Sequence, residues 1–244
     1  MRADAEHMLK HLIDENALHV RLGLHFEMAR SERDADGLDW IVTETGRRLP
    51  MLRQTSGKRL SLADFLPFDE SAFPSQLGYF AVAVTSDSGH DSCNCPECKM
   101  DYEPMLLRSI KVTLAEAASS WVDARLKAEL RSSDEFDVAN RALKDKVKIV
   151  KPAAGYSSCP DHSLKADIIA AIPDSEQLGI GFTETFAMIP DASICAFVFA
   201  HPEASYPDIR ELPEHILKLY AAARHFTEEQ FRIFLGHLCA GSGE

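Results

Sequence analysis

The chain has 244 residues, 45% hydrophobic and 26% charged, values typical of a globular protein with a sizeable core. Its 26 Lys and Arg against 38 Asp and Glu leave a formal net charge of −12, which argues against nucleic acid as a partner. The N-terminus lacks the apolar core of a signal peptide, and the longest apolar stretch, 194–200, is too short to span a membrane. These features predict a soluble cytoplasmic protein with no nucleic-acid or membrane partner.

Alternating apolar residues predict strands in the first part of the chain. Residues 20–28 alternate between apolar and polar at a period of two, as a half-buried strand requires, and a second strand is expected at 38–43. The polar segment between them ends in Asp36 and Gly37, which favours a hairpin with a longer loop. A third strand is expected at 79–85.

Apolar residues at a spacing of three and four predict the helices. The longest is expected over about 104–130, where this spacing places the apolar side chains in one stripe. Shorter helices are expected at 163–171, at 213–224 and from Thr227, where the run Thr-Glu-Glu-Gln is a capping-box pattern.

Two further apolar segments, 180–185 and 193–200, lie on either side of Pro190 and resemble a second hairpin. Strands and helices are mixed without a regular βαβ order, and no segment repeats at a fixed period. The sequence therefore predicts an α+β fold built around a mainly antiparallel sheet.

The most unusual segment is KPAAGYSSCPDH, which begins at Lys151. Pro152 fixes one backbone angle and Gly155 permits conformations closed to other residues, so the amides of this turn can approach a ligand closely. Tyr156 offers an aromatic face and a hydroxyl, and Lys151 a cation for a carboxylate or phosphate. The alternative is a structural loop in which Asp161 caps the following helix.

A cysteine cluster occupies the polar loop at about 86–101. Cys93, Cys95 and Cys98 form a C-x-C-x-x-C pattern after His90, and three thiolates with one imidazole can complete a tetrahedral zinc site. Structural zinc sites usually draw on two separated pairs, so the alternative is an adventitious or redox-sensitive loop. We expect substoichiometric zinc at most.

Several blocks of the sequence resemble the C-terminal reactivation domain of cobalamin-dependent methionine synthase, and they occur in the same order as in that family. The chain contains no segment that resembles the homocysteine, folate or cobalamin modules, so we expect a reactivation domain standing alone, as a single domain over 1–244. The blocks are LADF at Leu62, LAEA at Leu114, KPAAGYSSCPDH at Lys151, TETFAMIP at Thr183 and FVFAHP at Phe197 with Tyr206 soon after.

The resemblance implies both a fold and a function. The fold is a single α+β domain with a bent, mainly antiparallel sheet flanked by helices. The function is to bind S-adenosylmethionine and to present its methyl group to cob(II)alamin on a cobalamin-binding methionine synthase module, while flavodoxin or another electron donor supplies an electron. The sulfonium already activates the methyl group, so no general acid or base is required and the protein need only orient the ligand.

Part of the ligand site is implied by position in the same way. Asp64 would bind the methionine end of S-adenosylmethionine, and Lys151 would hold its carboxylate where the family has an arginine. Main-chain groups from Ala153 through Gly155 to Tyr156 would line the adenosyl part. A lysine lacks the two-pronged hydrogen bonding of an arginine, so Lys151 should bind a carboxylate more weakly.

The remaining implied residues are aromatic and acidic. Tyr206 and Pro207 would stand where the family has a ligand-contacting aromatic pair. Pro207 lacks both the aromatic ring and the backbone N–H of the second position. Glu116 and Asp145 would match acidic residues near the positively charged sulfonium.

Three functions remain open at this point. The chain is a component of a split methionine synthase, a reactivator of another corrinoid methyltransferase that uses its cysteine loop, or a non-catalytic regulatory protein that binds S-adenosylmethionine. A basic patch is needed if an acidic partner docks, and Lys144, Lys146 and Lys148 alternate along an expected extended segment before Lys151. The alternative for these lysines is a solvated strand edge.

Overall fold

One six-stranded antiparallel sheet organises the computed structural model, which describes residues 2–68, 76–87, 102–132 and 147–239. The strand order is β3-β2-β1-β4-β8-β5, and a separate pair joins β6 to β7. The strands of the large sheet are β1 (Leu18–Arg33), β2 (Asp39–Thr43), β3 (Arg48–Met51), β4 (Gln76–Ser86), β5 (Lys148–Val150) and β8 (Ser193–His201). The short pair is β6 (Gly181–Phe182) and β7 (Met188–Ile189).

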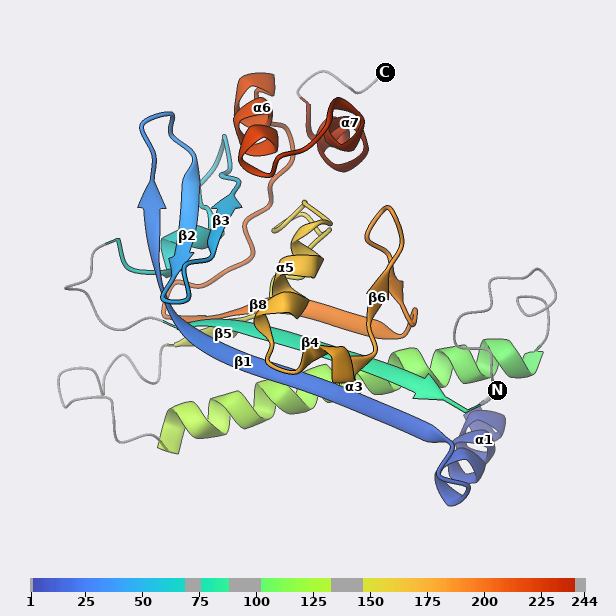
Figure 1. Ribbon diagram of the computed structural model, residues 1–244. Helices are drawn as coiled ribbons and strands as arrows, with labels where there is room; N and C mark the ends of the chain where they lie inside the picture. Colours follow the sequence, from blue (N-terminus) through green and yellow to red (C-terminus); the bar gives the residue numbers. More distant parts are fainter. Residues whose placement is uncertain (1, 69–75, 88–101, 133–146, 240–244) are drawn as a thin grey trace.

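The sheet is bent because β1 belongs to two sections of it. Residues 18–28 of β1 pair with β4, and residues 29–33 pair with β2. Figure 1 shows β1 running along β4 and then turning upright beside β2. The bent antiparallel sheet that the resemblance implies is therefore confirmed.

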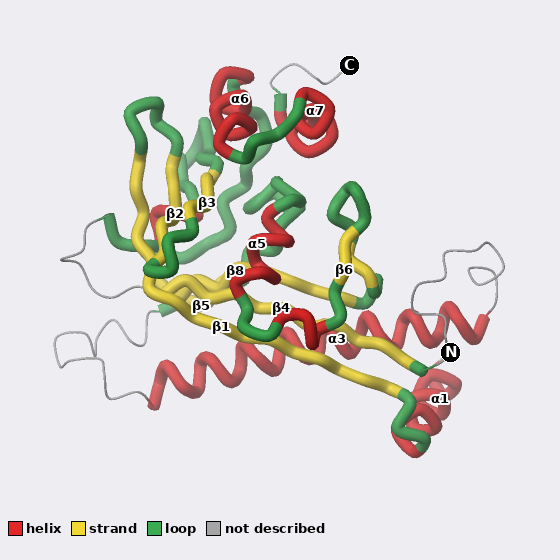
Figure 2. The backbone as a smooth tube through the Cα atoms, in the orientation of Figure 1, coloured by secondary structure: helices red, strands yellow, loops and turns green. Residues whose placement is uncertain are grey.

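Helices cover both faces of the long section of the sheet. Figures 1 and 2 show α3 along one face, with α5 and the β6–β7 pair on the other and α6 and α7 near the upright section. In the described residues no helix has the length and apolarity to cross a membrane. The helices are α1 (Arg2–Asp14), α3 (Tyr102–Ser132), α5 (Leu164–Ala171), α6 (Glu214–Ala223) and α7 (Glu228–Leu235), with short 3-10 turns η1 (Leu62–Phe65), η3 (Ser175–Leu178) and η4 (Gly236–Leu238).

The period of two in β4 and β8 divides the core between the two faces of the sheet. Phe80 and Val198 belong to the cluster that packs against α3. Their neighbours in sequence, Tyr79 and Phe197, belong to the cluster that includes residues of α5. A third cluster joins α6 and α7 to the loop before β2. Both faces of the central strands are thus buried, which explains why β4 is apolar almost throughout.

Most of the predicted elements are present. The strands expected at 20–28, 38–43 and 79–85 are β1, β2 and β4, and the first hairpin pairs β1 with β2 as predicted. The four predicted helices are α3, α5, α6 and α7, and Thr227 begins α7 with the expected capping box. Four elements were not predicted from the sequence: α1, β3, β5 and β7.

The predicted second hairpin is wrong. Residues 181–182 pair with 188–189, whereas β8 pairs with β4 and β5. A tight turn at Thr183 ends β6 directly after Phe182. The Thr183 N–H donates to the Ala187 carbonyl, the Thr183 carbonyl accepts from the Phe186 N–H, and the Thr183 hydroxyl accepts from the Ala187 N–H at 3.0 Å. The apolar run of β8 is instead explained by its place inside the large sheet.

Candidate ligand-binding site

A cavity of about 610 Å³ lies beside β8, between α3 and the segment that follows β5. Aromatic, acidic and basic side chains share its wall with small apolar ones. The lining residues are Val112, Ala115, Glu116, Lys151, Ala153, Ala154, Tyr156, Ser157, Ser158, Lys165, Met188, Asp191, Ala192, Ser193, Ile194, Cys195 and Tyr206.

The topology of the sheet creates this cavity. β5 pairs only with residues 199–201 of β8, so the first part of β8 has no strand on that side among the described residues. The segment after β5 takes that place, and the Pro152 carbonyl accepts a hydrogen bond from the Phe197 N–H at 3.2 Å. Because backbone direction alternates along a strand, the polar backbone groups of Cys195 also point to that side. Cys195 lines the cavity.

The turn at Gly155 is held in one conformation. Gly155 has a φ of +96°, its N–H donates to the Cys159 carbonyl at 2.7 Å, and the Cys159 N–H donates to the Tyr156 carbonyl at 2.8 Å. A Cβ atom at Gly155 would lie 2.4 Å from the ring of His162. Glycine is therefore required both by the backbone angle and by the packed imidazole.

Buried polar contacts fix the far end of the same turn. The Asp161 carboxylate is 1% exposed and accepts hydrogen bonds from the Ser163 N–H at 2.8 Å and the Tyr220 hydroxyl at 2.9 Å. Arg224 lies 3.3 Å from Asp161 and 2.7 Å from Asp167. Asp161 thus binds the N–H of Ser163, the N-cap residue of α5, and it also joins the turn to α6, whereas α5 itself has no side-chain cap.

Lys151 carries its charge toward α3. Its ammonium donates to the carbonyl and the hydroxyl of Ser119 at 2.6 and 2.5 Å and forms an ion pair with Asp123 at 2.9 Å. The same ammonium lies 4.9 Å from the centre of the Phe80 ring. Its side chain is only 10% exposed, so Lys151 is a cavity residue whose cation already has a carboxylate partner.

A second lysine, Lys165 of α5, lies at the opposite wall. It is 9% exposed, and its ammonium donates to the Phe186 carbonyl at 2.9 Å and contacts His162 Nδ1 at 3.0 Å. Burial lowers the pKa of Lys165, and burial together with the Lys165 charge lowers the pKa of His162. Burial raises the pKa of the neighbouring Cys195 thiol to about 12, so this thiol is protonated at neutral pH.

Two tyrosines and a glutamate bring exposed groups to the cavity. The side chains of Tyr156 and Tyr206 are 71% and 59% exposed, and Glu116 lies on the exposed side of α3. The Tyr206 hydroxyl accepts a hydrogen bond from the Lys151 N–H at 3.0 Å, which anchors that ring beside the segment. The cavity therefore offers aromatic faces and a carboxylate at its open side, a combination suited to a cationic ligand.

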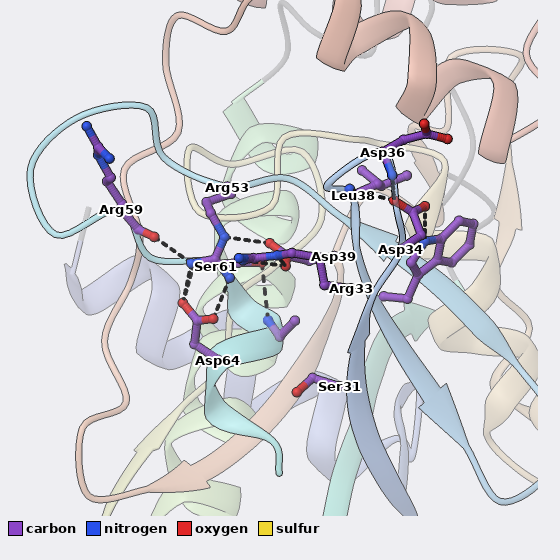
Figure 3. Close-up of polar contacts among 12 residues, drawn as sticks. Ser31, Arg33, Asp34, Asp36, Leu38, Asp39, Arg53, Arg59, Ser61 and Asp64 are labelled. Atoms are coloured by element: carbon purple, nitrogen blue, oxygen red, sulfur yellow. Dashed lines mark hydrogen bonds and ion pairs between the residues drawn. The ribbon is translucent and has the colours of Figure 1, made fainter. Parts of the chain in front are cut away.

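Asp64 is engaged elsewhere and does not line the cavity. Arg53 donates to both Asp64 oxygens, at 2.8 and 2.5 Å, and Asp64 accepts the Ser61 N–H at 2.9 Å in a capping box of η1. Figure 3 shows Arg53 between Asp64 and Asp39, and Arg33 also contacts Asp39. In this arrangement Asp64 is an ion-pair and capping residue of the fold.

The predicted site residues are thus only partly brought together. The cavity wall includes Glu116, Lys151, Ala153, Tyr156 and Tyr206. Gly155 shapes the turn without lining the cavity, and Pro207 is buried next to Tyr206. Asp145 and the cysteines Cys93, Cys95 and Cys98 lie outside the described residues. Within those residues no group of three His, Cys, Asp or Glu side chains is placed to hold a metal ion.

Three residues that line the cavity were not predicted from the sequence: Lys165, Met188 and Cys195. Lys165 is the one charged residue of the three, and it lies in the first turn of α5 together with Asp167. The signal that the sequence offers is a lysine in a short, mostly apolar helix, because lysine is rarely buried without a partner.

Comparison with known proteins relates the chain to one family of domains. A family model described as "Vitamin B12 dependent methionine synthase, activation domain" matches residues 1–225. Among solved structures, the crystal structure of the MetH reactivation domain bound to AdoHcy is similar with a TM-score of 0.78 and 24% sequence identity. That likeness covers 98% of this chain and 76% of the other, and it shows a shared fold.

Proposed function

The chain belongs to the activation-domain family of vitamin B12 dependent methionine synthase, and on this premise we propose that it binds S-adenosylmethionine in the cavity beside β8. The family resemblance predicted from the sequence is confirmed by the match over residues 1–225. The related reactivation domain is described with AdoHcy bound, the product that S-adenosylmethionine leaves after losing its methyl group.

The observation that carries this proposal is the convergence of five implied ligand residues on one cavity. Glu116 comes from α3, Lys151, Ala153 and Tyr156 from the segment after β5, and Tyr206 from the loop after β8. The volume of about 610 Å³ falls within the range of about 300–1,000 Å³ that is common for small-molecule sites.

The chemistry of the wall suits the adenine and the sulfonium of the ligand. The exposed ring faces of Tyr156 and Tyr206 can stack on adenine or attract the sulfonium by cation–π interaction. The Glu116 carboxylate adds a negative charge on the α3 side, which favours a cation there. Binding at this site would orient the methyl group without any acid or base from the chain.

We further propose that the methyl group is delivered to cobalamin on a partner module. Cob(II)alamin accepts one electron from flavodoxin or another donor, and the cobalt then takes the methyl group from sulfur, so that a Co–C bond forms, the S–C bond breaks and S-adenosylhomocysteine leaves. The contribution of this chain is to hold the donor sulfur at the open side of the cavity, near Tyr156 and Tyr206.

Two measurements, made one after the other, test the proposal. Calorimetry with S-adenosylmethionine should show one site per chain with micromolar or weaker affinity, and Tyr156→Ala should weaken binding by about ten-fold, the scale of one lost aromatic contact. No heat at millimolar ligand would exclude the binding function.

Methylation is then measured with separate cobalamin modules, S-adenosylmethionine and a reductant. Formation of methylcobalamin with a methionine synthase module supports a split methionine synthase. Formation only with another corrinoid protein supports a reactivator of another corrinoid methyltransferase. Tight binding of S-adenosylmethionine without methylation of any corrinoid partner would favour a regulatory protein.

A further inference from the structure

Lys165 is a buried cation without an anionic partner. Its two hydrogen-bond acceptors, the Phe186 carbonyl at 2.9 Å and His162 Nδ1 at 3.0 Å, are both neutral groups. Among the described residues no carboxylate lies within ion-pair distance of its ammonium. A charge that is nine-tenths buried and unpaired costs free energy, and proteins normally supply such a charge with a counter-ion.

The other cavity lysine presents the opposite case. Lys151 has its counter-ion in Asp123 at 2.9 Å and two further acceptors in Ser119, so its ammonium has three close partners. The counter-ion and the two hydrogen bonds to Ser119 together compensate the buried charge of Lys151. A ligand carboxylate could bind Lys151 only by displacing partners that it already has.

Lys165 lines the same cavity, and one of its three N–H groups has no acceptor among the described residues. Two of its three N–H groups are used by the contacts above, and its side chain lines the cavity together with Cys195 and Ser158. The lowered pKa of Lys165 is consistent with a cation that gains when a negative charge arrives.

We propose that Lys165, and not Lys151, binds the carboxylate at the amino-acid end of S-adenosylmethionine in this chain. The inference rests on the proposed binding of S-adenosylmethionine and names the residue that recognises one end of it. The ligand then lies with its carboxylate at the α5 wall of the cavity and its adenosyl and sulfonium parts toward α3 and the two tyrosines. Lys151 acts as a positioning residue that ties the segment after β5 to α3.

The experiment compares S-adenosylmethionine with decarboxylated S-adenosylmethionine, which lacks only the carboxylate, by calorimetry. The parent chain should prefer the carboxylated ligand by about ten-fold or more, the scale of one charge-assisted hydrogen bond. In Lys165→Met this preference should fall to about three-fold or less, because the carboxylate loses its counter-ion. In Lys165→Arg, which keeps the charge, the preference should remain.

Two matched variants separate this role from other effects. Lys151→Met should bind both ligands more weakly and keep the preference for the carboxylated one, and Lys218→Met, on the exposed side of α6, should leave both affinities unchanged. If Lys165→Met does not fold, Lys165→Gln replaces it, since its amide can still donate to the Phe186 carbonyl.

The outcomes are distinct. A preference that survives Lys165→Met and disappears in Lys151→Met would overturn this inference and leave the proposed function standing. A parent chain that binds both ligands equally would also overturn it. A parent chain that binds neither ligand would overturn the proposed function itself, and the inference with it.

Discussion

Gly155 is the residue on which the shape of the binding turn most directly depends. Its φ of +96° and the His162 ring at 2.4 Å from an added Cβ make two separate demands for glycine. Gly155→Ala should therefore lower the free energy of unfolding by roughly 2–4 kcal/mol, from backbone strain plus the clash. Urea unfolding measures this loss, and calorimetry should show weaker binding of S-adenosylmethionine.

Gly37 provides a matched control for the clash. Its φ of +88° is close to that of Gly155, but nothing lies within 4 Å of an added Cβ there. Gly37→Ala should show the strain alone, about 1–2 kcal/mol. Equal losses in the two variants would mean that the His162 ring moves aside freely and does not fix the turn.

Glu27 is a buried carboxylate that links stability to pH. Burial acts to raise its pKa, but hydrogen bonds from Thr45 at 2.5 Å and Tyr79 at 2.6 Å, with Arg47 nearby, outweigh burial and lower the pKa below its usual value of 4.5. A carboxyl group with a lowered pKa stabilises the folded state above the unfolded pKa and loses that contribution as pH falls through the folded pKa.

We therefore expect stability to fall as the solution is acidified below about pH 4.5, the ordinary pKa of a glutamate. Glu27→Gln should reduce the difference in unfolding free energy between pH 7 and pH 3, measured by urea unfolding at each pH. The exposed Glu203→Gln serves as the control and should leave that difference unchanged. If the parent, Glu27→Gln and Glu203→Gln all show the same difference in unfolding free energy between pH 7 and pH 3, Glu27 does not contribute to the loss of stability in acid.

The site could be predicted from sequence only where its residues lie in one motif. Lys151 and Tyr156 stand together in KPAAGY, and both line the cavity. The partner of Lys151 is the Asp123 carboxylate, and the partner of Lys165 is the Phe186 carbonyl. Both partners lie far from the lysines in sequence and reach them only through the fold. For the same reason the partner of Asp64, Arg53, was not expected.

At the scale of elements, apolar periodicity predicted the long helices and strands. It failed for the short strands, which form only because they pair with a neighbouring strand. The long helix α3 and the strands β1 and β4 have clear apolar patterns over many residues. β3, β5 and β7 have only two to four residues each, too few for a period to emerge, and they exist because a neighbouring strand supplies their hydrogen bonds. The helix α1 has no buried residue, so its sequence carries little apolar signal.

The helix α7 begins after the last residue of the family match, yet it completes a core cluster. Phe234 is 3% exposed and contacts the rings of Phe186 and Phe226 at centroid distances of 5.5 and 5.4 Å. Phe234→Ala should cost about 3–5 kcal/mol of unfolding free energy, as expected for a buried aromatic side chain. Its neighbour Ile233 is 51% exposed, so Ile233→Ala should cost well under half as much.

Urea unfolding of the two variants checks this prediction. A small loss for Phe234→Ala, comparable to that for Ile233→Ala, would mean that α7 unfolds separately and contributes little to the rest of the fold. The backbone hydrogen bond from the Leu212 N–H to the Leu238 carbonyl at 2.8 Å argues for the larger loss, because it joins the end of the chain to the loop before α6.

At the scale of the whole molecule, charge decides how a partner can approach. A net charge of −12 would repel an acidic partner over most of the surface, so docking of such a partner near the cavity would require a local positive region. Lys148 is exposed on β5, three residues before the cavity residue Lys151. Lys144 and Lys146 precede it in the sequence, outside the described residues.

If this basic region guides docking, Lys148→Glu should slow methylation of cob(II)alamin in a reconstituted mixture while leaving the affinity for S-adenosylmethionine unchanged. The slowing should be largest at low salt and shrink at about 0.5 M salt, because screening shortens the reach of the charge. Lys58→Glu makes the same change of charge on the exposed loop after β3 and should have a smaller effect, since that loop does not line the cavity. Rates that match the parent at every salt concentration would leave Lys148 as a solvated residue at the edge of the sheet with no part in docking.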